Sequence, residues 1–394
     1  MESRSPRTVV LADLHLVRDA LGSVSGPVAA LVRENPGARI IFAGDLFDLP
    51  ASHPRLTGAR AVREVLGVHV ELCRALAIHV DQGGELWLLG GNHDAEVGAG
   101  ELREGFLDAL GPTPQGRARV RVSPWFFRDG AVHIEHGHHY DPDNAPGHPL
   151  VLGRASLGVH FVEQLIAPTG AHHYLQSNDD TPLKLFVASF TRYGKRAPYV
   201  IYRYFHTAIG AMLRSGPLYR AGDEVTLGRE RGAGFAEEIG IPPAMIDELY
   251  ALGATPTLES FSRTFTRVYF DRVVASLTML SGLGALGLGA RKPGAVIFGL
   301  GAAMMGASWA SGHNRYGGTV PEMLAEAAAA VATATGARLV VFGHTHREAL
   351  SEGYANTGSF AFPGKAPGRP YLTIEGTAEA PRAVRHYWSP EPGL

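Results

Sequence analysis

Five short groups of histidine, aspartate and asparagine residues are spread along the chain, each directly after a run typical of a β-strand. They are Asp13-Leu14-His15, Gly44-Asp45-Leu46-Phe47-Asp48, Gly91-Asn92-His93-Asp94, His136-Gly137-His138-His139 and Gly343-His344-Thr345-His346. Open α/β sheets bind ligands at the carboxyl ends of their strands. We therefore expect the five loops to converge on one site.

The side chains in these groups offer carboxylate oxygens, an amide oxygen and imidazole nitrogens, and no thiolate. This mixture suits Mn, Fe, Zn or Co better than a soft metal or Ca. A carboxylate can also bridge two cations about 3.5–4 Å apart, as two-metal hydrolases require. We take Asp45 as the bridge and predict two divalent metal ions, with Mn as the preferred identity.

Each group alone could be an ordinary turn or polar loop. Five of them in this order predict a metal centre, and two cations that share a water lower its pKa enough to make it a nucleophile near neutral pH. No Walker-type glycine loop, Gly-x-Ser-x-Gly elbow or Cys-x-x-Cys pair offers a competing chemistry. The pattern indicates hydrolysis by an activated water.

The elements that carry these groups alternate strands with helix-like stretches, which is typical of an α/β domain. We predict strands near 7–12, 38–43, 85–90 and 131–135. The last part of the chain predicts a helix over 321–335 and strands near 338–342, 354–357, 371–375 and 383–388. We assign 1–140 and 318–394 to one domain.

Residues 141–317 differ in character and are predicted to form a large, mainly helical insertion. It leaves the domain just after His136 and returns before the strand that delivers His344, so we expect it to roof or flank the site. Between 184 and 220 it interleaves basic with aromatic side chains. A solvated helix face is one interpretation, and an amphipathic surface that meets a membrane or a phosphorylated headgroup is the other. Lys195 and Arg196 are the candidate substrate contacts in this run.

A second feature of the insertion is an apolar pair of segments at 273–312. No charged residue occurs from Val273 to Ala290 or from Ala295 to Gly312. We predict a helical hairpin that turns at Arg291-Lys292-Pro293-Gly294 and enters a bilayer, since each arm of roughly 18 residues is about 27 Å long as a helix. A buried hairpin in the core or at a dimer interface is the alternative. The basic residues that flank its outer ends favour the cytoplasmic side: Arg263, Arg267, Arg272 and Arg315.

The composition of the chain limits which kinds of partner and which cellular compartment we expect. The 394 residues include 36 basic and 38 acidic side chains, so no global charge draws the chain to nucleic acid. Cys73 is the only cysteine, and its amphipathic surroundings predict an inert core residue. No secretory leader is evident at Met1-Glu2-Ser3-Arg4. We expect the protein to be located at the cytoplasmic face of a membrane, and a soluble cytoplasmic protein is the alternative.

In their order and spacing, the five groups resemble the motifs of the calcineurin-like metallophosphoesterases: D-x-H, GD-x-x-D, GNH-D/E, H and GH-x-H. The resemblance covers the two terminal parts and not the insertion. It implies two mixed β-sheets sandwiched between helices. It also implies one metal held by Asp13, His15, Asp45 and His346, and a second held by Asp45, Asn92, His136 and His344. His93 would then be a catalytic proton donor or charge stabiliser.

Four neighbours of these residues have expected roles of their own. Asp48 and Asp94 should orient ligands and loop backbone, because carboxylates behind a metal site commonly fix histidine tautomers. His138 and His139 follow the ligand position His136 and are candidate substrate contacts. The turn Asn356-Thr357-Gly358-Ser359 should support the site.

Within the family, the chain is most similar to the UDP-diacylglucosamine hydrolases of lipid A synthesis. The likeness rests on Ala-Asp-Leu-His-Leu, Gly-Asp-Leu-Phe-Asp, Gly-His-Thr-His-Arg and Asn-Thr-Gly. Those enzymes carry a shorter lipid-holding cap, and many have Arg where this chain has His93. Our leading hypothesis is a membrane-associated hydrolase of a phosphorylated lipid or lipid-linked pyrophosphate. The alternatives are a membrane-tethered phosphatase or phosphodiesterase for a nucleotide or phosphoprotein, and a metal-bound scaffold.

Overall fold

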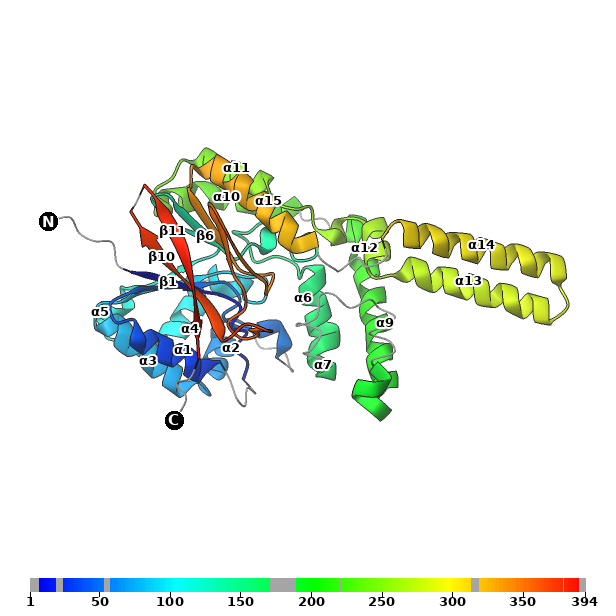
Figure 1. The fold of residues 1–394 in the computed structure, drawn as a ribbon, viewed down its shortest axis with the longest axis horizontal. Helices are drawn as coiled ribbons and strands as arrows, with labels where there is room; N and C mark the ends of the chain where they lie inside the picture. Colours follow the sequence, from blue (N-terminus) through cyan, green and yellow to red (C-terminus); the bar gives the residue numbers. More distant parts are fainter. Residues whose placement is uncertain are drawn as a thin grey trace. The chain divides into compact units, whose positions relative to one another are not determined.

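The structure is a computed structural model that describes residues 7–18, 24–52, 57–98, 100–170, 189–219, 222–312, 319–377 and 379–389 (Figure 1). The chain divides into two units. The first unit comprises Met1–Glu163, Ala221–Pro256 and Val320–Leu394, and the second unit comprises Gln164–Arg220 and Thr257–Thr319. Residues 141–163 and 221–256, which the sequence assigns to the insertion, therefore belong to the first unit.

The first unit contains two mixed β-sheets. One has the strand order β11-β10-β1-β2-β3-β4, with β1 to β4 parallel and β10 and β11 antiparallel. Its strands are β1 (Thr8–Leu11), β2 (Arg39–Ala43), β3 (Glu85–Leu89), β4 (Val120–Ser123), β10 (Arg369–Gly376) and β11 (Pro381–Trp388). The other has the order β5-β6-β7-β9-β8, in which β6, β7 and β9 are parallel. Its strands are β5 (Phe126–Asp129), β6 (Val132–Glu135), β7 (Leu339–Phe342), β8 (Glu348–Ser351) and β9 (Tyr354–Thr357).

The two sheets face each other across an apolar core. Successive side chains of a strand point to opposite faces, so Val10 and Ile41 pack between the sheets with Ile134 and Val341 of the second sheet. Their neighbours along the strands, such as Val9, point to the outer face of the first sheet. The parallel strands are covered on both faces, which explains their continuous β-branched and apolar sequences.

Helices cover the outer face of each sheet. The first sheet packs against α1 (Ser25–Glu34), α2 (Gly58–Leu66), α3 (Val70–Asp81) and α4 (Gly100–Leu110). The second packs against α10 (Gly222–Ile239), α11 (Pro243–Ala251) and α15 (Thr319–Thr335). The remaining short elements of this unit are η1 (Leu49–Ala51), η2 (Ala95–Gly98), α5 (Pro114–Arg117), η3 (His138–Tyr140) and α6 (Leu157–Phe161).

The α/β class, with two mixed sheets flanked by helices, is confirmed. The predicted strands and the helix over 321–335 match β1, β2, β3, β6, β7, β9, β10, β11 and α15. Strands β4, β5 and β8 were not predicted from the sequence. Cys73 is buried in the core beneath the first sheet, as expected.

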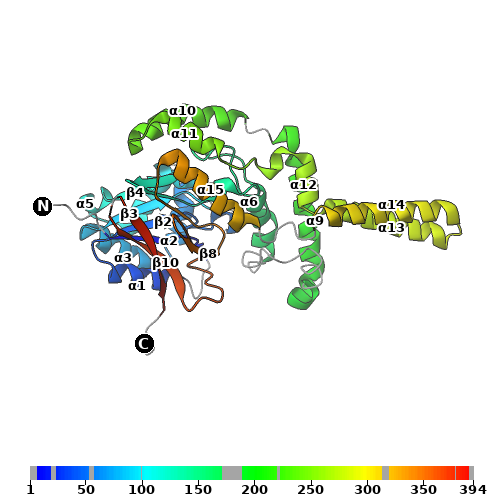
Figure 2. The ribbon, with the colours of Figure 1, turned by 45° about the horizontal axis from the view of Figure 1, so that its top comes forward.

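The second unit is helical. After η4 (Val162–Ile166), a π-helix shared with the first unit, come α7 (Ala167–Thr169), η6 (Gly194–Arg196), α9 (Ala197–Arg214), η7 (Gly216–Leu218), η8 (Thr257–Glu259) and α12 (Phe261–Arg267). A helical hairpin follows, formed by α13 (Phe270–Gly287) and α14 (Arg291–Ala310) (Figure 2). Residues 184–188, Arg220 and Arg315 lie outside the described residues.

The predicted helical hairpin at 273–312 is confirmed, but its turn is not at Arg291-Lys292-Pro293-Gly294. The turn is formed by residues 288–290, and Pro293 lies in the first turn of α14. Proline is tolerated there because the first N–H groups of a helix have no intrahelical acceptor to lose. The sequence alone does not distinguish such a proline from one that ends a helix.

Candidate metal centre

All five sequence groups meet at the carboxyl ends of parallel strands. Asp13 and His15 follow β1, Asp45 follows β2, Asn92 follows β3, His136 follows β6 and His346 follows β7. Backbone hydrogen bonds tie the loops together: His15 N donates to Asp45 O at 2.9 Å, and Gly343 N donates to His136 O at 3.0 Å. The convergence predicted from the sequence is confirmed.

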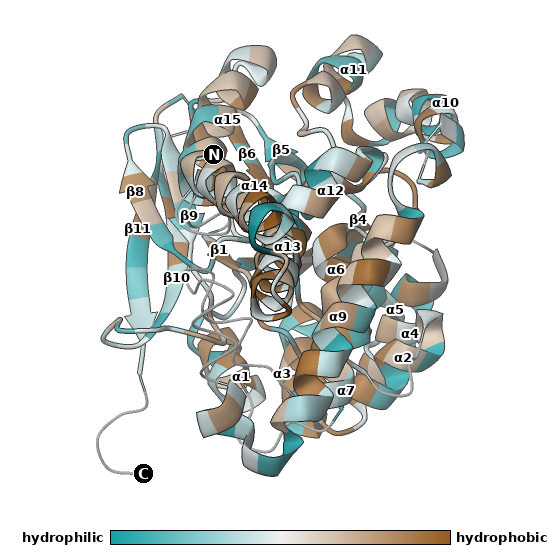
Figure 3. Ribbon diagram, turned by 90° about the vertical axis from the view of Figure 1, so that its right-hand side faces the viewer, coloured by the Kyte–Doolittle hydropathy of each residue, from teal (hydrophilic) through white to brown (hydrophobic). Residues whose placement is uncertain are grey.

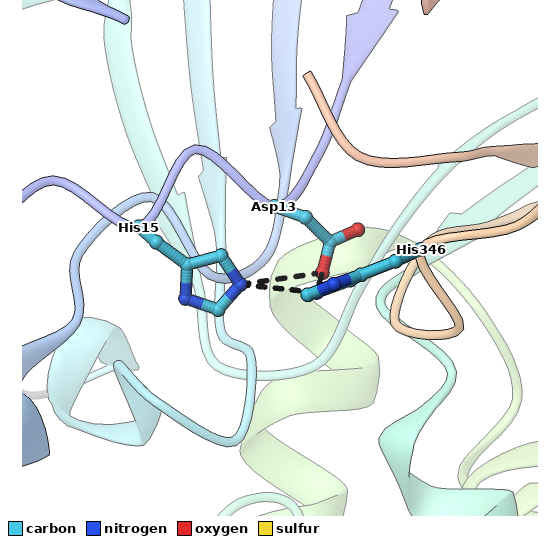
Figure 4. Close-up of side chains that lie close together, drawn as sticks. All are labelled: Asp13, His15 and His346. Atoms are coloured by element: carbon cyan, nitrogen blue, oxygen red, sulfur yellow. Dashed lines mark hydrogen bonds and ion pairs between the residues drawn. The ribbon is translucent and has the colours of Figure 1, made fainter. Parts of the chain in front are cut away.

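One group of ligand atoms is formed by Asp13, His15 and His346 (Figure 4). His346 Nε2 lies 3.2 Å from Asp13 Oδ1 and 3.1 Å from His15 Nε2. Asp13 Oδ1 is buried and receives no hydrogen bond from the described residues. Burial and the positive charge of His93 lower the pKa of His15 to about 4, so its ring is neutral near pH 7 and keeps a free lone pair.

Asp45 joins this group to a second one. Its Oδ2 lies 3.9 Å from His15 Nε2 and 3.2 Å from His136 Nε2. Its Oδ1 is held by the backbone N–H of His93 at 2.9 Å, which fixes the carboxylate. Burial raises the pKa of Asp45, but the charges of His136 and His93 outweigh this and hold the pKa well below its usual value. Asp45 is therefore an ionised, oriented carboxylate that faces both groups.

The second group consists of Asp45, His136 and Asn92. His136 Nδ1 donates to the carbonyl of Ala43 at 2.9 Å, so Nε2 is the nitrogen that faces the site. It lies 3.2 Å from Asn92 Oδ1. Asp13, Asp45 and His136 also form a cluster whose ligand atoms all lie within 4.8 Å of one another. Burial lowers the pKa of His136, but the charge of Asp45 outweighs it and raises the pKa to about 9, so Nε2 carries a proton that a bound cation would displace.

Two residues that the sequence analysis missed orient this second group. Asp141 Oδ2 accepts hydrogen bonds from His344 Nε2 at 2.9 Å and from Asn144 Nδ2 at 2.8 Å. The amide of Asn144 is thereby oriented, and its Oδ1 accepts from Asn92 Nδ2 at 3.1 Å. The Oδ1 of Asn92 must then face His136. Asp141 and Asn144 stand in an Asp-Pro-Asp-Asn turn after the histidines, and that turn was the signal available in the sequence.

His344 lies beside the second group but points its Nε2 at Asp141. Its ring centroid is 5.2 Å from that of His136, and its backbone N donates to Asp13 Oδ2 at 3.1 Å. Burial raises the pKa of Asp141, whereas hydrogen bonds and charge from His344 lower it below its usual value. Asp141 is thus an ionised carboxylate that holds the ring of His344 through Nε2.

His93 is held as a cation against these groups. Its Nδ1 donates to Asp48 Oδ1 at 2.8 Å, and its ring meets that of His15 edge-on with the centroids 4.8 Å apart. Burial lowers the pKa of His93, but the charges of Asp48 and Asp45 outweigh it and raise the pKa to about 10. At neutral pH the ring therefore carries a proton beside the metal-type ligands.

Asp94 supports the loop that carries Asp45. Its Oδ1 accepts from the backbone N–H groups of Gly91 at 2.8 Å and Asp45 at 3.2 Å, and its Oδ2 accepts from Phe47 N at 3.2 Å. Burial and the charge of Asp45 raise the pKa of Asp94 to about 7. The Asn356 turn has a similar function: Asn356 Nδ2 donates to Gly343 O, and Ser359 Oγ donates to Asp13 O.

The backbone at the centre is strained. Among the described residues, six non-glycine positions have a left-handed φ, and five of them are predicted ligands: Asp13, His15, Asp45, His344 and His346. Such conformations cost of order 1–3 kcal/mol each and persist only where the surrounding structure enforces them. Their concentration on these residues indicates that side-chain direction, rather than local backbone preference, determines the conformation here.

The candidate substrate residues fall into three places. His138 is buried at the centre, with its ring 5.4 Å from that of His136, and its Nδ1 has no hydrogen-bond partner among the described residues. His139 instead stacks on Tyr250, and its Nε2 donates to the carbonyl of the same residue at 3.3 Å. Lys195 and Arg196 belong to the second unit.

Taken together, buried carboxylates, imidazoles and an amide oxygen converge from five loops, with no sulfur ligand among the described residues of these loops. This donor set fits divalent cations of the Mn, Fe, Zn or Co type. No known family model and no curated protein matches the chain.

Proposed function

We propose that the chain is a dinuclear-metal phosphoesterase with the metallophosphoesterase fold, which hydrolyses a phosphate ester or a pyrophosphate. The position of Asp45 Oδ2 is the observation that carries this proposal, because it lies 3.9 Å from His15 Nε2 and 3.2 Å from His136 Nε2. Two groups of metal-type ligands share one carboxylate, as expected for cations about 3.5–4 Å apart.

The residues that would hold the two cations form two sets, and the Asp45 carboxylate is common to both. Asp13, His15 and His346 would complete the first position with Asp45. Asn92, His136 and His344 would complete the second, with Asp141 behind His344. When bound, the cations would supply a water of lowered pKa as nucleophile and positive charge for the phosphoryl oxygens.

His93 is the group of this chain that would act on the leaving oxygen. Its ring is protonated and fixed by Asp48, so the other ring nitrogen has a proton to give. As the water oxygen bonds to phosphorus and the bond to the leaving oxygen breaks, that oxygen takes the proton of His93. The proton lost by the water passes to solvent, and His93 is then reprotonated.

For the substrate, we propose a phosphorylated lipid or a lipid-linked pyrophosphate. The support is the apolar hairpin α13–α14, whose exposed leucines and valines would place the protein at a membrane. A nucleotide or phosphoprotein substrate is the alternative. The two properties are separable: the chain can be a phosphoesterase even if its substrate is not a lipid.

The test is a hydrolysis assay of the purified full chain with Mn²⁺ in mixed detergent micelles. Phosphate release would be compared for lipid phosphates, lipid-linked pyrophosphates, aryl phosphates and phosphopeptides. We expect metal-dependent hydrolysis that EDTA abolishes and that is fastest for a lipid substrate. Preference for phosphopeptides would overturn the lipid class alone, whereas no hydrolysis of any phosphoester with Mn, Fe, Zn or Co would overturn the phosphoesterase.

A further inference from the structure

The helices α13 and α14 pack closely along their length. Cβ atoms added to the glycines between them would clash: at Gly282 with Phe298 N at 2.4 Å, at Gly294 with Leu286 N at 2.8 Å and at Gly301 with Met279 N at 2.7 Å. Gly282, Gly294 and Gly301 therefore lie at the contact between the two arms, where half-buried side chains such as Met279 and Phe298 meet them. Close pairs with small residues at the contact are typical of membrane helices.

The outward faces of both helices are apolar and exposed. Leu280 is 61% exposed and Val296 is 70% exposed. Leu277, Leu283 and Leu300 are exposed as well. Soluble monomers rarely show continuous apolar surfaces of this kind, and such surfaces mark contacts with protein or membrane. Here the exposed residues occur on both arms.

Two exposed hydroxyl groups within the hairpin are hydrogen-bonded to the backbone of their own helix. Thr278 Oγ1 donates to Val274 O at 2.8 Å, and Ser281 Oγ donates to Leu277 O at 2.8 Å. All backbone groups of a helix interior are also paired within the helix. A segment in hydrocarbon must satisfy its hydrogen bonds internally, and these exposed hydroxyls do so.

The two ends of the hairpin are chemically different from its middle. At the base, the Arg272 guanidinium lies 4.7 Å from the ring centroid of Tyr269 and 5.8 Å from that of Trp309. Arg272 Nε also donates to Ser308 Oγ at 3.0 Å. At the tip, Leu288 is 90% exposed, and Arg291 and Lys292 begin α14. Figure 3 looks along the hairpin from this tip and shows hydrophilic colour there.

The length of the hairpin matches the thickness of a bilayer. The 20 residues of α14 form a helix about 30 Å long, equal to a typical hydrocarbon core of about 30 Å. In the described part of the chain, α14 is the one helix that is long and apolar enough by itself to cross a membrane, and α13, with 18 residues, would cross as its packed partner. Arginine, tyrosine and tryptophan at one end and arginine and lysine at the other are the side chains expected at the two headgroup layers.

Helix α9 adds a surface at the base of the hairpin. It runs crosswise to α13 and α14 within the second unit (Figures 1 and 2). Tyr204 Oη of α9 donates to Val268 O at 3.0 Å, just before the start of α13. Tyr202, Ile209 and Leu213 of α9 are exposed. A helix with exposed aromatic and aliphatic side chains that lies across a membrane hairpin suits the headgroup region.

We infer that the hairpin α13–α14 spans a lipid bilayer, with Tyr269, Arg272 and Trp309 in one headgroup layer and Arg291 and Lys292 in the other. Helix α9 lies in the first of these layers. A lipid bilayer covers both arms on every side, which a second protein surface docked on one face does not. This inference does not depend on the proposed hydrolysis, and its tests use no activity.

The first test is flotation of the purified full chain with vesicles of phosphatidylcholine and phosphatidylglycerol. Leu280→Arg places a charge in the middle of α13, and we expect a fall of about 10-fold or more in the bound fraction, since a central arginine is strongly disfavoured in hydrocarbon. Leu350→Arg is the matched control, because Leu350 is 49% exposed on β8, and it should float like the unmodified chain. Circular dichroism checks that both variants are folded.

The second test locates the tip. Leu288→Cys and, as a control at the base, Phe261→Cys are treated with a membrane-impermeant maleimide, and the native Cys73 is buried. We expect external reagent to label the base, and only reagent trapped inside the vesicles to label the tip. External labelling of the tip in floated protein would overturn the span. Two results would overturn membrane insertion altogether. One is a Leu280→Arg variant that floats to the same extent as the unmodified chain, and the other is an intact chain that forms a soluble dimer and does not bind vesicles.

Discussion

The ring of His93 is positioned by one carboxylate and faces another. The Nδ1–H of His93 donates a hydrogen bond to Asp48 Oδ1 at 2.8 Å. The backbone N–H of His93 donates to Asp45 Oδ1 at 2.9 Å. The same residue therefore fixes the proposed bridge and carries a proton beside it. His93 also lies with His15 and Asp45 in a group whose ligand atoms are all within 4.8 Å of one another, and its charged ring, hydrogen-bonded to Asp48, favours proton donation to a leaving oxygen over metal ligation.

His93→Ala should keep bound metal but slow hydrolysis by roughly 10²–10⁴, the usual range for a positioned acid or base. The loss should be smaller for aryl phosphates with good leaving groups, which need less proton donation. Steady-state rates across a leaving-group series measure this. His386→Ala, which changes a histidine on β11 away from the centre, should keep the unmodified rate. An equal loss for good and poor leaving groups would contradict proton donation.

The hydrogen-bonded series Asp141–Asn144–Asn92 leads to a second prediction about single residues. Asn144→Ala removes the acceptor that orients the Asn92 amide. Mutation of such supporting partners lowers metal affinity by about 10- to 100-fold, so we expect this loss at one of two Mn²⁺ sites, measured by calorimetric titration. Asn35→Ala removes a buried hydrogen bond far from the centre, in the cap of α1, and should leave both affinities intact. Unchanged binding in Asn144→Ala would contradict the positioning role.

The sequence could identify the candidate ligands and the supporting residues Asp48 and Asp94, but not Asp141 and Asn144. Asp13, Asp45 and His136 stand in motifs at strand ends, and those positions follow from topology alone. The role of Asp141 depends on a turn that brings its carboxylate to His344, and the motifs do not show this contact. His139 is adjacent to His138 yet packs on Tyr250, because the short helix η3 points successive side chains in different directions.

At the scale of elements, two glycines make room for the ligands. A Cβ on Gly44 would lie 2.5 Å from the ring of His136, and one on Gly91 would lie 2.2 Å from Asp45 Oδ1. Gly44 also has a φ of +89°, whereas Gly91 does not have a positive φ. Gly91 is therefore required for space and not for backbone conformation.

Gly91→Ala should displace the Asp45 carboxylate and reduce Mn²⁺ binding and hydrolysis together, by about 10-fold or more in affinity. Metal titration of the folded variant measures this. Gly26→Ala in α1 is the matched control, because a Cβ there meets nothing within 4 Å. It should be neutral or slightly stabilising. Normal metal binding in Gly91→Ala would show that the bridge tolerates displacement.

The elements that sequence reasoning missed have a common cause. β4, β5 and β8 are four-residue strands at the edges of their sheets, and each carries a charged side chain, so no continuous apolar run marks them in the sequence. Helices α10 and α11 fell within the predicted insertion, but Phe235 and Leu249 pack into the core of the second sheet. Amphipathic helices show that a face is buried but do not show which sheet it covers.

At the scale of the whole molecule, the first unit is assembled from three separate stretches of chain, and its metal-type ligands come from the first and the last of them. Asp13, His15 and His346 illustrate this, since they are brought together across more than three hundred residues. A cation bound there would link both ends of the unit and stabilise the folded state by mass action.

The metal content of the purified chain tests the central claim most directly. Equilibrium dialysis with Mn²⁺ followed by elemental analysis should give two ions per folded chain, and Asp45→Asn should give fewer than two and lose nearly all turnover. Circular dichroism would establish that the variant is folded. If the unmodified chain bound one ion or none, or if Asp45→Asn kept two ions and most of its rate, the two-metal centre bridged by Asp45 would be wrong.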